Sequence, residues 1–214
     1  MKIISVVGAR PQFIKSAPVS KAIAAAGHQE YQVHTGQHYD YGMSRVFFEE
    51  LDITEPVINL GIGSGTHAEQ TGRMLMGIEK ALISQKPDVV LVYGDTNSTL
   101  AGALAAAKLH LRLAHVEAGL RSYNRQMPEE HNRVLTDHCS DVLFCPTQTA
   151  VDNLSREGIN EGVHLVGDTM YDAVLLFGEI AAQRSRILQS LELDPKKYLL
   201  TTLHRAYNTD DPEV

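Results

Sequence analysis

The chain has 214 residues, of which 43% are hydrophobic, 21% charged and 6% aromatic, a composition typical of folded globular proteins rather than of disordered or fibrous ones. Its 19 Lys and Arg residues and 26 Asp and Glu residues give a net charge of −7, which argues against nucleic acid or an anionic membrane as a general partner. A chain of this length can bury a large core without disulfides.

The cysteine content and the N-terminus indicate where such a protein resides. Cys139 and Cys145 form neither a disulfide framework nor a zinc-binding spacing, so reduced thiols are the simpler interpretation. The apolar run at residues 3–7 is too short for a signal peptide, and no segment approaches the ~20 apolar residues of a membrane span. We therefore expect a soluble, cytoplasmic protein.

Predicted strands and helices alternate along the chain. In order, the sequence predicts a strand at 2–7, a helix at 11–26, a strand at 31–35, helices at 41–51 and 66–85, a strand at 88–93, a helix ending near 109, a strand at 112–116, a helix at 128–139, a strand at 142–145, a helix capped by Thr147 and ending at 156, a strand at 163–166 and a helix at 170–191. The strands are continuously apolar, which predicts an α/β fold with a Rossmann-like parallel sheet covered by helices on both faces.

The segment after residue 192 predicts a domain boundary. A turn at 193–197 precedes one further strand at 198–203, and no helix is predicted after it. A lone strand after a complete α/β unit is typical of the beginning of a second domain. We expect an N-terminal domain with its connecting helix at residues 1–192, and the start of a truncated C-terminal domain at 193–214.

Polar residues follow several of the predicted strands at their carboxyl ends, where open parallel sheets bind ligands. Asp95 comes after the strand at 88–93, and Glu117 comes directly after the strand at 112–116. Asp95 could instead cap the following helix, although Thr96 and Asn97 can serve as caps themselves. Two carboxylates facing one site would suit acid–base chemistry on a neutral substrate.

Cationic residues are candidates for binding an anion at the same edge. Arg10 and Lys15 frame the start of the first predicted helix, which suits a phosphate, although a solvated lysine is equally common there. His204 and Arg205 follow the lone strand, where a positive pair also suits an anion. Neither G-x-G-x-x-G nor a Walker A sequence occurs, so the sequence predicts neither a dinucleotide nor ATP.

The remaining acidic and histidine residues carry weaker signals. Glu129 and Glu130 lie in the first turn of the helix at 128–139, where acidic side chains complement the helix dipole. On this evidence Glu129 is structural, and the role of Glu130 stays open. The ten histidines include no H-E-x-x-H sequence or pairing that would close a zinc site, so we predict no metal.

Five short sequences follow one another in a specific order. They are GARPQFIK at 8–15, GDT at 94–96, HVEAGLR at 115–121, PEEHNR at 128–133 and HR at 204–205. Together they resemble the non-hydrolysing UDP-N-acetylglucosamine 2-epimerases, and the resemblance covers essentially the whole chain. It implies the N-terminal half of a GT-B-type two-domain fold, with residues 193–214 as the start of the C-terminal nucleotide-binding domain.

The resemblance also implies an activity and a site. Members of the family interconvert UDP-GlcNAc and UDP-ManNAc for surface polysaccharide synthesis by eliminating and re-adding UDP through a glycal, without a cofactor, commonly as homodimers. It implies acid–base roles for Asp95, Glu117 and Glu130 and assistance to the leaving UDP by His204. The residues that it implies for substrate binding are all cationic, namely Arg10, Lys15, Arg133 and Arg205.

Departures from the family pattern leave alternatives open. Gln12 stands where many members carry Glu, and GARPQFIK together with residues 97–103 is also similar to the branch that acts on UDP-2,3-diacetamido-glucuronic acid. A GT-B glycosyltransferase and an inactive fragment that only binds a nucleotide sugar are further alternatives. Residues 1–214 alone would lack the facing domain, so we expect negligible turnover from them.

Overall fold

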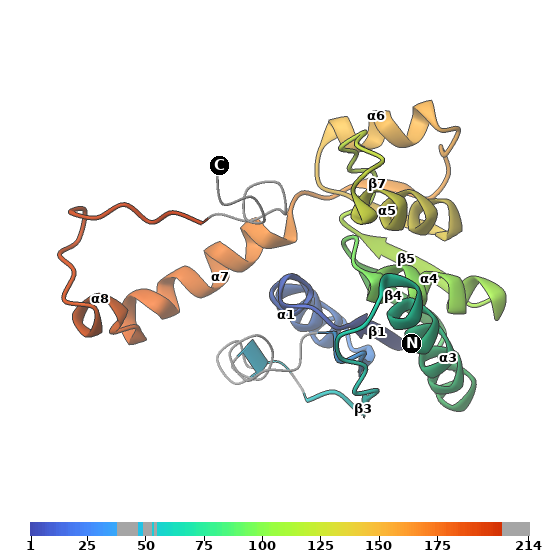
Figure 1. Cartoon of the computed structure of the whole chain (residues 1–214), viewed down its shortest axis with the longest axis horizontal. Coiled ribbons are helices and arrows are strands. Elements are labelled where there is room, and N and C mark those ends of the chain that lie inside the picture. The colour runs from blue at the N-terminus through green and yellow to red at the C-terminus, as the bar shows by residue number, and fades with distance from the viewer. Residues whose placement is uncertain (38–46, 49–52, 54, 203–214) are drawn as a thin grey trace. The chain divides into compact units, whose positions relative to one another are not determined.

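The computed structural model describes residues 1–37, 47, 48, 53 and 55–202 (Figure 1). The chain divides into two compact units, residues 1–177 and 178–214. The first unit holds the sheet and the helices that cover it, and the second holds the end of one helix and a further short helix. The division falls inside a helix, so the boundary expected at residues 192 and 193 stays a prediction.

The strands of the described residues form one parallel sheet. Its seven strands are ordered β3-β2-β1-β4-β5-β6-β7, and their bounds are β1 Lys2–Val7, β2 Gln29–His34, β3 Ile58–Asn59, β4 Val89–Tyr93, β5 Arg112–Val116, β6 Val142–Cys145 and β7 Val163–Leu165. The order reverses at β1 and β4, and ligands of doubly wound sheets bind in the crevice at such a switch point. The sheet therefore has its binding edge where β1, β4 and β5 end.

Helices cover the two faces of this sheet. They are α1 Arg10–Ala25, α3 His67–Gln85, α4 Asn97–Lys108, α5 Pro128–Cys139, α6 Gln148–Arg156, α7 Thr169–Arg184 and α8 Ile187–Ser190. Val90 and Val92 of β4 pack in the cluster with α3 and α4, and Leu91 and Tyr93 pack in the cluster with α1 on the opposite face (Figure 1). Because β4 is buried on both faces, its sequence is continuously apolar.

Side-chain caps fix where three helices begin. The hydroxyls of Thr66, Thr96 and Thr147 accept hydrogen bonds from backbone N–H groups in the first turns of α3, α4 and α6. Pro128 opens α5, a position at which the missing N–H of proline costs nothing. The predicted starts of these helices are confirmed to within one or two residues.

Two predictions at the C-terminal side are wrong. The helix expected at 170–191 is interrupted, because the Ser185 hydroxyl accepts a hydrogen bond from the backbone N–H of Ile187 at 3.4 Å and so competes with helical bonding. Residues 198–202, expected in a strand, are not in one. A strand needs a partner, and the described part of the second unit has no other strand to pair with it.

Other differences are small. The two-residue edge strand β3, which pairs with Val33 and His34, was not predicted. The helix expected at 41–51 falls largely outside the described residues, as does residue 203. Within the described part of the chain, no helix combines the length and apolarity that crossing a bilayer requires.

The sheet face on the α1 side is open over β5 and β6. A hollow of about 470 Å³ lies there within the first unit. Its lining is mainly apolar and includes Ile23 of α1, Leu91 of β4, Val116 of β5 and Phe144 of β6. In the described residues, α6 packs on the opposite face with Leu143 and Leu154 in its cluster, and α5 meets β5 on that face through Asp137 and His115, so neither helix covers this side.

Candidate active site

The first two site residues leave neighbouring strands at the same edge. Tyr93 at the end of β4 pairs with Val116 at the end of β5, so Asp95 and Glu117 both follow at the carboxyl ends of these strands. Gly94 has a φ of +63°, a conformation that glycine adopts without strain. A Cβ atom there would lie 3.2 Å from Glu117 Oε2 and 3.3 Å from Lys15 Nζ, so the turn passes close against both side chains.

Lys15 of α1 and Glu117 form an ion pair across this edge. Both side chains are largely buried, so the lysine is not the solvated residue that was one interpretation of the sequence. Glu117 has a φ of +73°, which is uncommon for a residue with a side chain. Such backbone strain is concentrated at functional sites.

Arg133 connects Asp95 with Glu130. Its guanidinium forms an ion pair with the Asp95 carboxylate, and its Nη1 lies 3.2 Å from Glu130 Oε2. The neighbouring Asn132 donates a hydrogen bond from Nδ2 to the Asp95 carbonyl at 2.9 Å. The start of α5 thus holds both the backbone and the side chain of Asp95.

Glu130 is buried, and both of its carboxylate oxygens are occupied. It accepts hydrogen bonds from the Ser122 N–H at 2.9 Å, the Ser122 hydroxyl at 2.8 Å and the Tyr123 N–H at 2.8 Å. Burial raises the pKa of Glu130, but these hydrogen bonds and the charge of Arg133 outweigh burial and hold the pKa below its usual range. In this arrangement Glu130 is an anion that anchors the loop before α5.

Gln12 occupies the start of α1. Its Oε1 accepts hydrogen bonds from the N–H groups of Gly8 at 2.8 Å and Ala9 at 3.0 Å. Its Nε2 donates to the Tyr93 carbonyl at 2.9 Å and to the Thr99 hydroxyl at 3.0 Å. These two N–H groups are therefore already paired within the chain, and an anion at this loop would depend on cationic side chains such as the exposed Arg10.

A buried network lies beneath the site and was not predicted from the sequence. His115 is fully buried; its Nε2 lies 2.7 Å from the Gly94 carbonyl oxygen and its Nδ1 lies 2.7 Å from Asp137 Oδ1. Arg121 donates to Asp137 Oδ2 at 2.7 Å and is also paired with Glu157. The only signal in the sequence was the position of His115 within HVEAGLR, to which no role was given.

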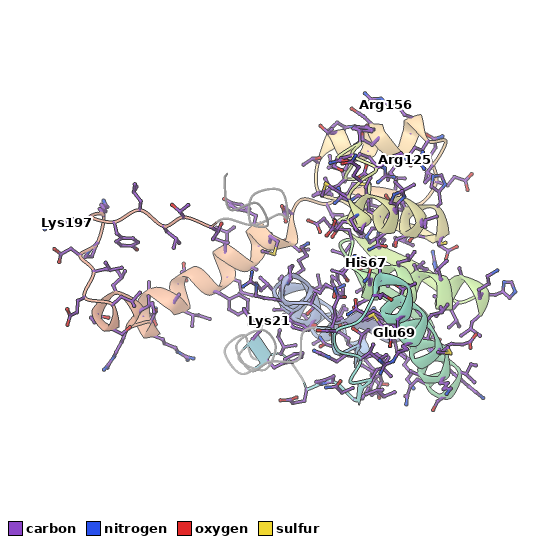
Figure 2. All side chains as sticks on the ribbon, in the orientation of Figure 1. Lys21, His67, Glu69, Arg125, Arg156 and Lys197 are labelled. Atoms are coloured by element: carbon purple, nitrogen blue, oxygen red, sulfur yellow. The ribbon has the colours of Figure 1, made fainter. Side chains whose placement is uncertain are left out.

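Polar side chains also gather at the start of α3 and α4. The Nδ2 atom of Asn97 lies 2.8 Å from Gln70 Oε1 and 3.2 Å from Nδ1 of His67, which is labelled in Figure 2. Asn132 Nδ2 reaches Asn97 Oδ1 at 3.3 Å. Through these contacts the first turns of α3, α4 and α5 are held together at one edge of the sheet.

Two predicted residues lie outside the described part of the chain. His204 and Arg205 fall among residues 203–214, so their proposed roles stay predictions. Among the described residues, no group of three or more His, Cys, Asp or Glu side chains could hold a metal ion. The structure brings together Asp95, Glu117, Glu130, Lys15 and Arg133.

Comparison with known proteins identifies the family. Residues 21–214 match the sequence model of a family described as UDP-N-acetylglucosamine 2-epimerase. The chain belongs to this family. The resemblance noted in the sequence is therefore confirmed, and the matched residues include Asp95, Glu117, Glu130 and Arg133.

Individual relatives are similar over the whole chain. The chain is 58% identical over 214 residues to a UDP-N-acetylglucosamine 2-epimerase homolog of Methanococcus maripaludis, covering 100% of this chain and 60% of that protein. It is 54% identical over 216 residues to the UDP-2,3-diacetamido-2,3-dideoxy-D-glucuronate 2-epimerase of Pseudomonas aeruginosa, covering 99% of this chain and 60% of that protein. The chain thus spans about 60% of the length of these relatives.

A solved structure of the family matches the fold. The UDP-GlcNAc 2-epimerase of Methanocaldococcus jannaschii, solved in complex with UDP-GlcNAc and UDP, aligns with a TM-score of 0.93 and 50% identity, covering 100% of this chain and 59% of that one. The predicted fold class is confirmed. The chain is an α/β unit with a Rossmann-like parallel sheet and corresponds to the N-terminal half of a GT-B-type fold.

Proposed function

We propose that this chain supplies one half of the active site of a non-hydrolysing UDP-N-acetylglucosamine 2-epimerase, which interconverts UDP-GlcNAc and UDP-ManNAc. One observation carries the proposal: Asp95 and Glu117 leave neighbouring strands at one edge of the sheet, each in contact with a cation. The family membership and the complex of the related M. jannaschii enzyme with UDP-GlcNAc support that sugar nucleotide as the substrate.

The chemistry requires carboxylates near carbon 2 of the sugar. That carbon has no adjacent carbonyl group, so direct deprotonation is too costly. A base therefore removes the proton from carbon 2 while the bond between carbon 1 and oxygen breaks, UDP leaves with the electron pair and a double bond forms between carbons 1 and 2. Delivery of a proton to the opposite face and return of UDP complete the epimerisation. General acid–base groups contribute about 10²–10⁴-fold each to such steps.

The contacts in the structure support roles for these residues. Asp95 and Glu117 accept and deliver the protons, and the neighbouring Arg133 and Lys15 hold the two carboxylates in place through ion pairs. Glu130, expected from the resemblance to share the acid–base work, holds Arg133 against Asp95 in this arrangement. By resemblance we assign the UDP diphosphate to Arg10, His204 and Arg205, because cations stabilise the charge of a departing diphosphate.

By resemblance we also propose the setting of the enzyme. We infer a cytoplasmic homodimer that supplies precursors for surface polysaccharide and uses no cofactor. The relatives from M. maripaludis and P. aeruginosa support the epimerase chemistry of this proposal, because both carry the name of a 2-epimerase.

Exchange of solvent deuterium tests the epimerase proposal. The test protein is a chimera of residues 1–202 and the C-terminal remainder of the M. jannaschii relative, incubated with UDP-GlcNAc in heavy water. We expect UDP-ManNAc and deuterium at carbon 2 of both sugars, and we expect Asp95→Asn to abolish both. Transfer or hydrolysis of the sugar without deuterium at carbon 2 would instead indicate a glycosyltransferase.

Two controls accompany this experiment. The intact M. jannaschii enzyme shows that the assay detects epimerisation. The 214-residue chain alone should show negligible turnover, because it spans only about 60% of the length of its relatives. Robust turnover by that chain alone would contradict the assignment of half a site to it.

A second substrate has specific support. The 54% identity to the UDP-2,3-diacetamido-2,3-dideoxy-D-glucuronate 2-epimerase of P. aeruginosa favours that sugar as an alternative. Two chimeras, one with the C-terminal remainder of each relative, allow kcat/KM to be compared for both substrates. If the N-terminal half determines specificity, both chimeras prefer the same sugar; if each chimera follows its C-terminal part, this chain does not decide between them.

A further inference from the structure

We propose that His115 is a positioning residue: its imidazole donates hydrogen bonds from both ring nitrogens and thereby fixes the backbone that carries Asp95. The side chain of His115 extends from β5 into the fully buried space between the ends of β4 and α5. Its two nitrogens contact one backbone carbonyl and one carboxylate, and neither of these groups belongs to β5.

The first hydrogen bond fixes one proton. Nε2 of His115 lies 2.7 Å from the carbonyl oxygen of Gly94. A carbonyl oxygen can only accept a hydrogen bond, so Nε2 must carry the hydrogen. A histidine in this position cannot use Nε2 as a base, because the lone pair that a base needs is replaced by the N–H bond.

The second hydrogen bond fixes the other proton. Nδ1 of His115 lies 2.7 Å from Oδ1 of Asp137. The other oxygen of that carboxylate accepts from Arg121 Nη1 at 2.7 Å and from the Gly119 N–H at 3.1 Å. These two donors favour the ionised carboxylate, which can only accept, so Nδ1 donates in this contact as well.

The surrounding charges support this state. Burial raises the pKa of Asp137, but its hydrogen bonds with His115 and Arg121 and their charges outweigh burial and lower the pKa. Arg121 is paired in turn with Glu157, which also lies 3.3 Å from His138 at the surface. His115 and Arg121 therefore both face the Asp137 carboxylate, and Arg121 also faces Glu157, so the buried carboxylates have hydrogen-bond donors.

Two neighbouring groups complete these surroundings. Burial raises the pKa of the Cys145 thiol to about 11, so it stays neutral. Lys15 and Glu117 meet near Gly94 and pair with each other. Neither places an uncompensated charge against the His115 ring.

The consequence falls on Asp95. The Gly94 carbonyl, on one side of Asp95, is held by His115, and the Asp95 carbonyl, on the other side, is held by Asn132 at 2.9 Å. Both peptide groups around this residue are therefore fixed by β5 and α5. If the proposed function holds, loss of the His115 contact misplaces the carboxylate of Asp95, and a misplacement of about 1 Å can cost about 10²-fold in rate.

Nitrogen NMR of the 214-residue chain tests the protonation directly. We expect both ring nitrogens of His115 to carry a proton at neutral pH and to show slowly exchanging N–H signals. We also expect a coupling across the hydrogen bond from Nε2–H to the Gly94 carbonyl. The exposed ring of His164 should show no such signals and serves as the internal reference. A ring nitrogen of His115 without a proton would overturn the proposal, whether or not the protein is an epimerase.

Two variants separate positioning from packing. His115→Gln keeps one donor and His115→Leu keeps none, while His164→Gln is the matched exposed control. In the chain alone, we expect the amide signals of Gly94 and Asp95 to move most in His115→Leu. In the chimera, kcat should fall by about 10²-fold in His115→Leu and by less in His115→Gln, with KM nearly unchanged. Lower stability in both variants with unchanged kcat per folded molecule and unmoved Asp95 signals would overturn a positioning role.

Discussion

Glu130 shows how much a single carboxylate can contribute to the order of a loop. Three hydrogen bonds from Ser122 and Tyr123 and the ion pair with Arg133 hold it in the first turn of α5. Because the pKa of Glu130 is lowered in the folded chain, its contribution to stability is fully present above the pKa of an unfolded glutamate, about 4.3. The contribution is lost as the pH falls through the lower folded pKa.

Replacement of this carboxylate should reduce both stability and its dependence on pH. We expect Glu130→Gln to lower the free energy of unfolding by about 1–3 kcal/mol at neutral pH, since an amide cannot accept all three hydrogen bonds. In urea unfolding, the difference in the free energy of unfolding between the variant and the chain without the substitution should shrink as the pH is lowered. As the control in the same turn, replacement of the half-buried neighbour, Glu129→Gln, should have little effect. A difference that is constant with pH would contradict the ionised state of Glu130.

Gly8 is required because two side chains occupy the space beside it. A Cβ atom at this position would lie 1.9 Å from Thr35 Oγ1 and 2.4 Å from Ser98 Oγ, and these hydroxyls are buried and 2.8 Å apart. We expect Gly8→Ala to destabilise the chain by about 1–3 kcal/mol, as overpacking does. Gly72→Ala in α3 meets no atom within 4 Å and should be neutral or stabilising. The measurement is the midpoint temperature of thermal unfolding of each variant. Equal midpoints for Gly8→Ala and Gly72→Ala would contradict the close packing around Gly8.

The sequence predicts which residues reach the site better than it predicts their partners. Asp95 and Glu117 were predictable because each follows a buried strand, and parallel strands end at one edge. The partner of Glu117 is Lys15, 102 positions away, and no local pattern connects them. His115 was missed for the same reason, since Gly94 and Asp137 lie on other elements. Glu130 was expected from the resemblance, but the hydrogen bonds that its carboxylate accepts from Ser122 and Tyr123 depend on the conformation of a loop.

At the scale of elements, α5 is the helix that organises the site. Its first turns supply Glu130, Asn132 and Arg133, and its last turn supplies Asp137 beneath β5. Pro128 at the start and the acidic first turn predict this helix over the bounds that the structure shows. The helix therefore couples the charge of Asp95 to the buried network around His115.

Weakening this coupling should affect catalysis more than folding. We expect Arg133→Leu in the chimera to lower kcat by about 10–100-fold, because Asp95 loses the cation that holds it, and Arg133→Lys to recover part of the loss. Arg125→Leu, in the loop before α5, is the matched control (Figure 2). The measurement is epimerisation by each variant after its folded fraction has been determined. Unchanged turnover in Arg133→Leu would show that Asp95 needs no such support.

The strands and helices of the first unit follow from local patterns. The bounds of β1, β5, β6 and α5 coincide with those predicted. Each strand is a short apolar run, and Pro128 marks the start of α5. The edge strand β3 has only two residues and no apolar pattern to predict it. Residues 198–202 have the composition of a strand, but composition cannot supply the neighbour that a strand needs.

At the scale of the molecule, this chain is about 60% of the length of its relatives. The described part of its first unit nevertheless holds a seven-stranded parallel sheet whose clusters on the two faces include β1 and β4. We therefore expect the sheet to form in the chain alone, whether or not the chain turns over substrate. The NMR experiments on His115 depend on the sheet and not on turnover.

The hollow over β5 and β6 has a consequence for the solubility of the chain. Apolar side chains such as Val142 and Phe144 are only half-buried there, and open apolar surfaces of this kind promote aggregation. We expect the isolated chain to increase the fluorescence of a dye that binds apolar surfaces. We also expect its light scattering to rise more than in proportion to its concentration, as aggregates form. Phe144→Lys should reduce both signals, whereas Met76→Lys, exposed on α3, should not. If the two variants behave alike, some other surface governs the colloidal stability of the chain.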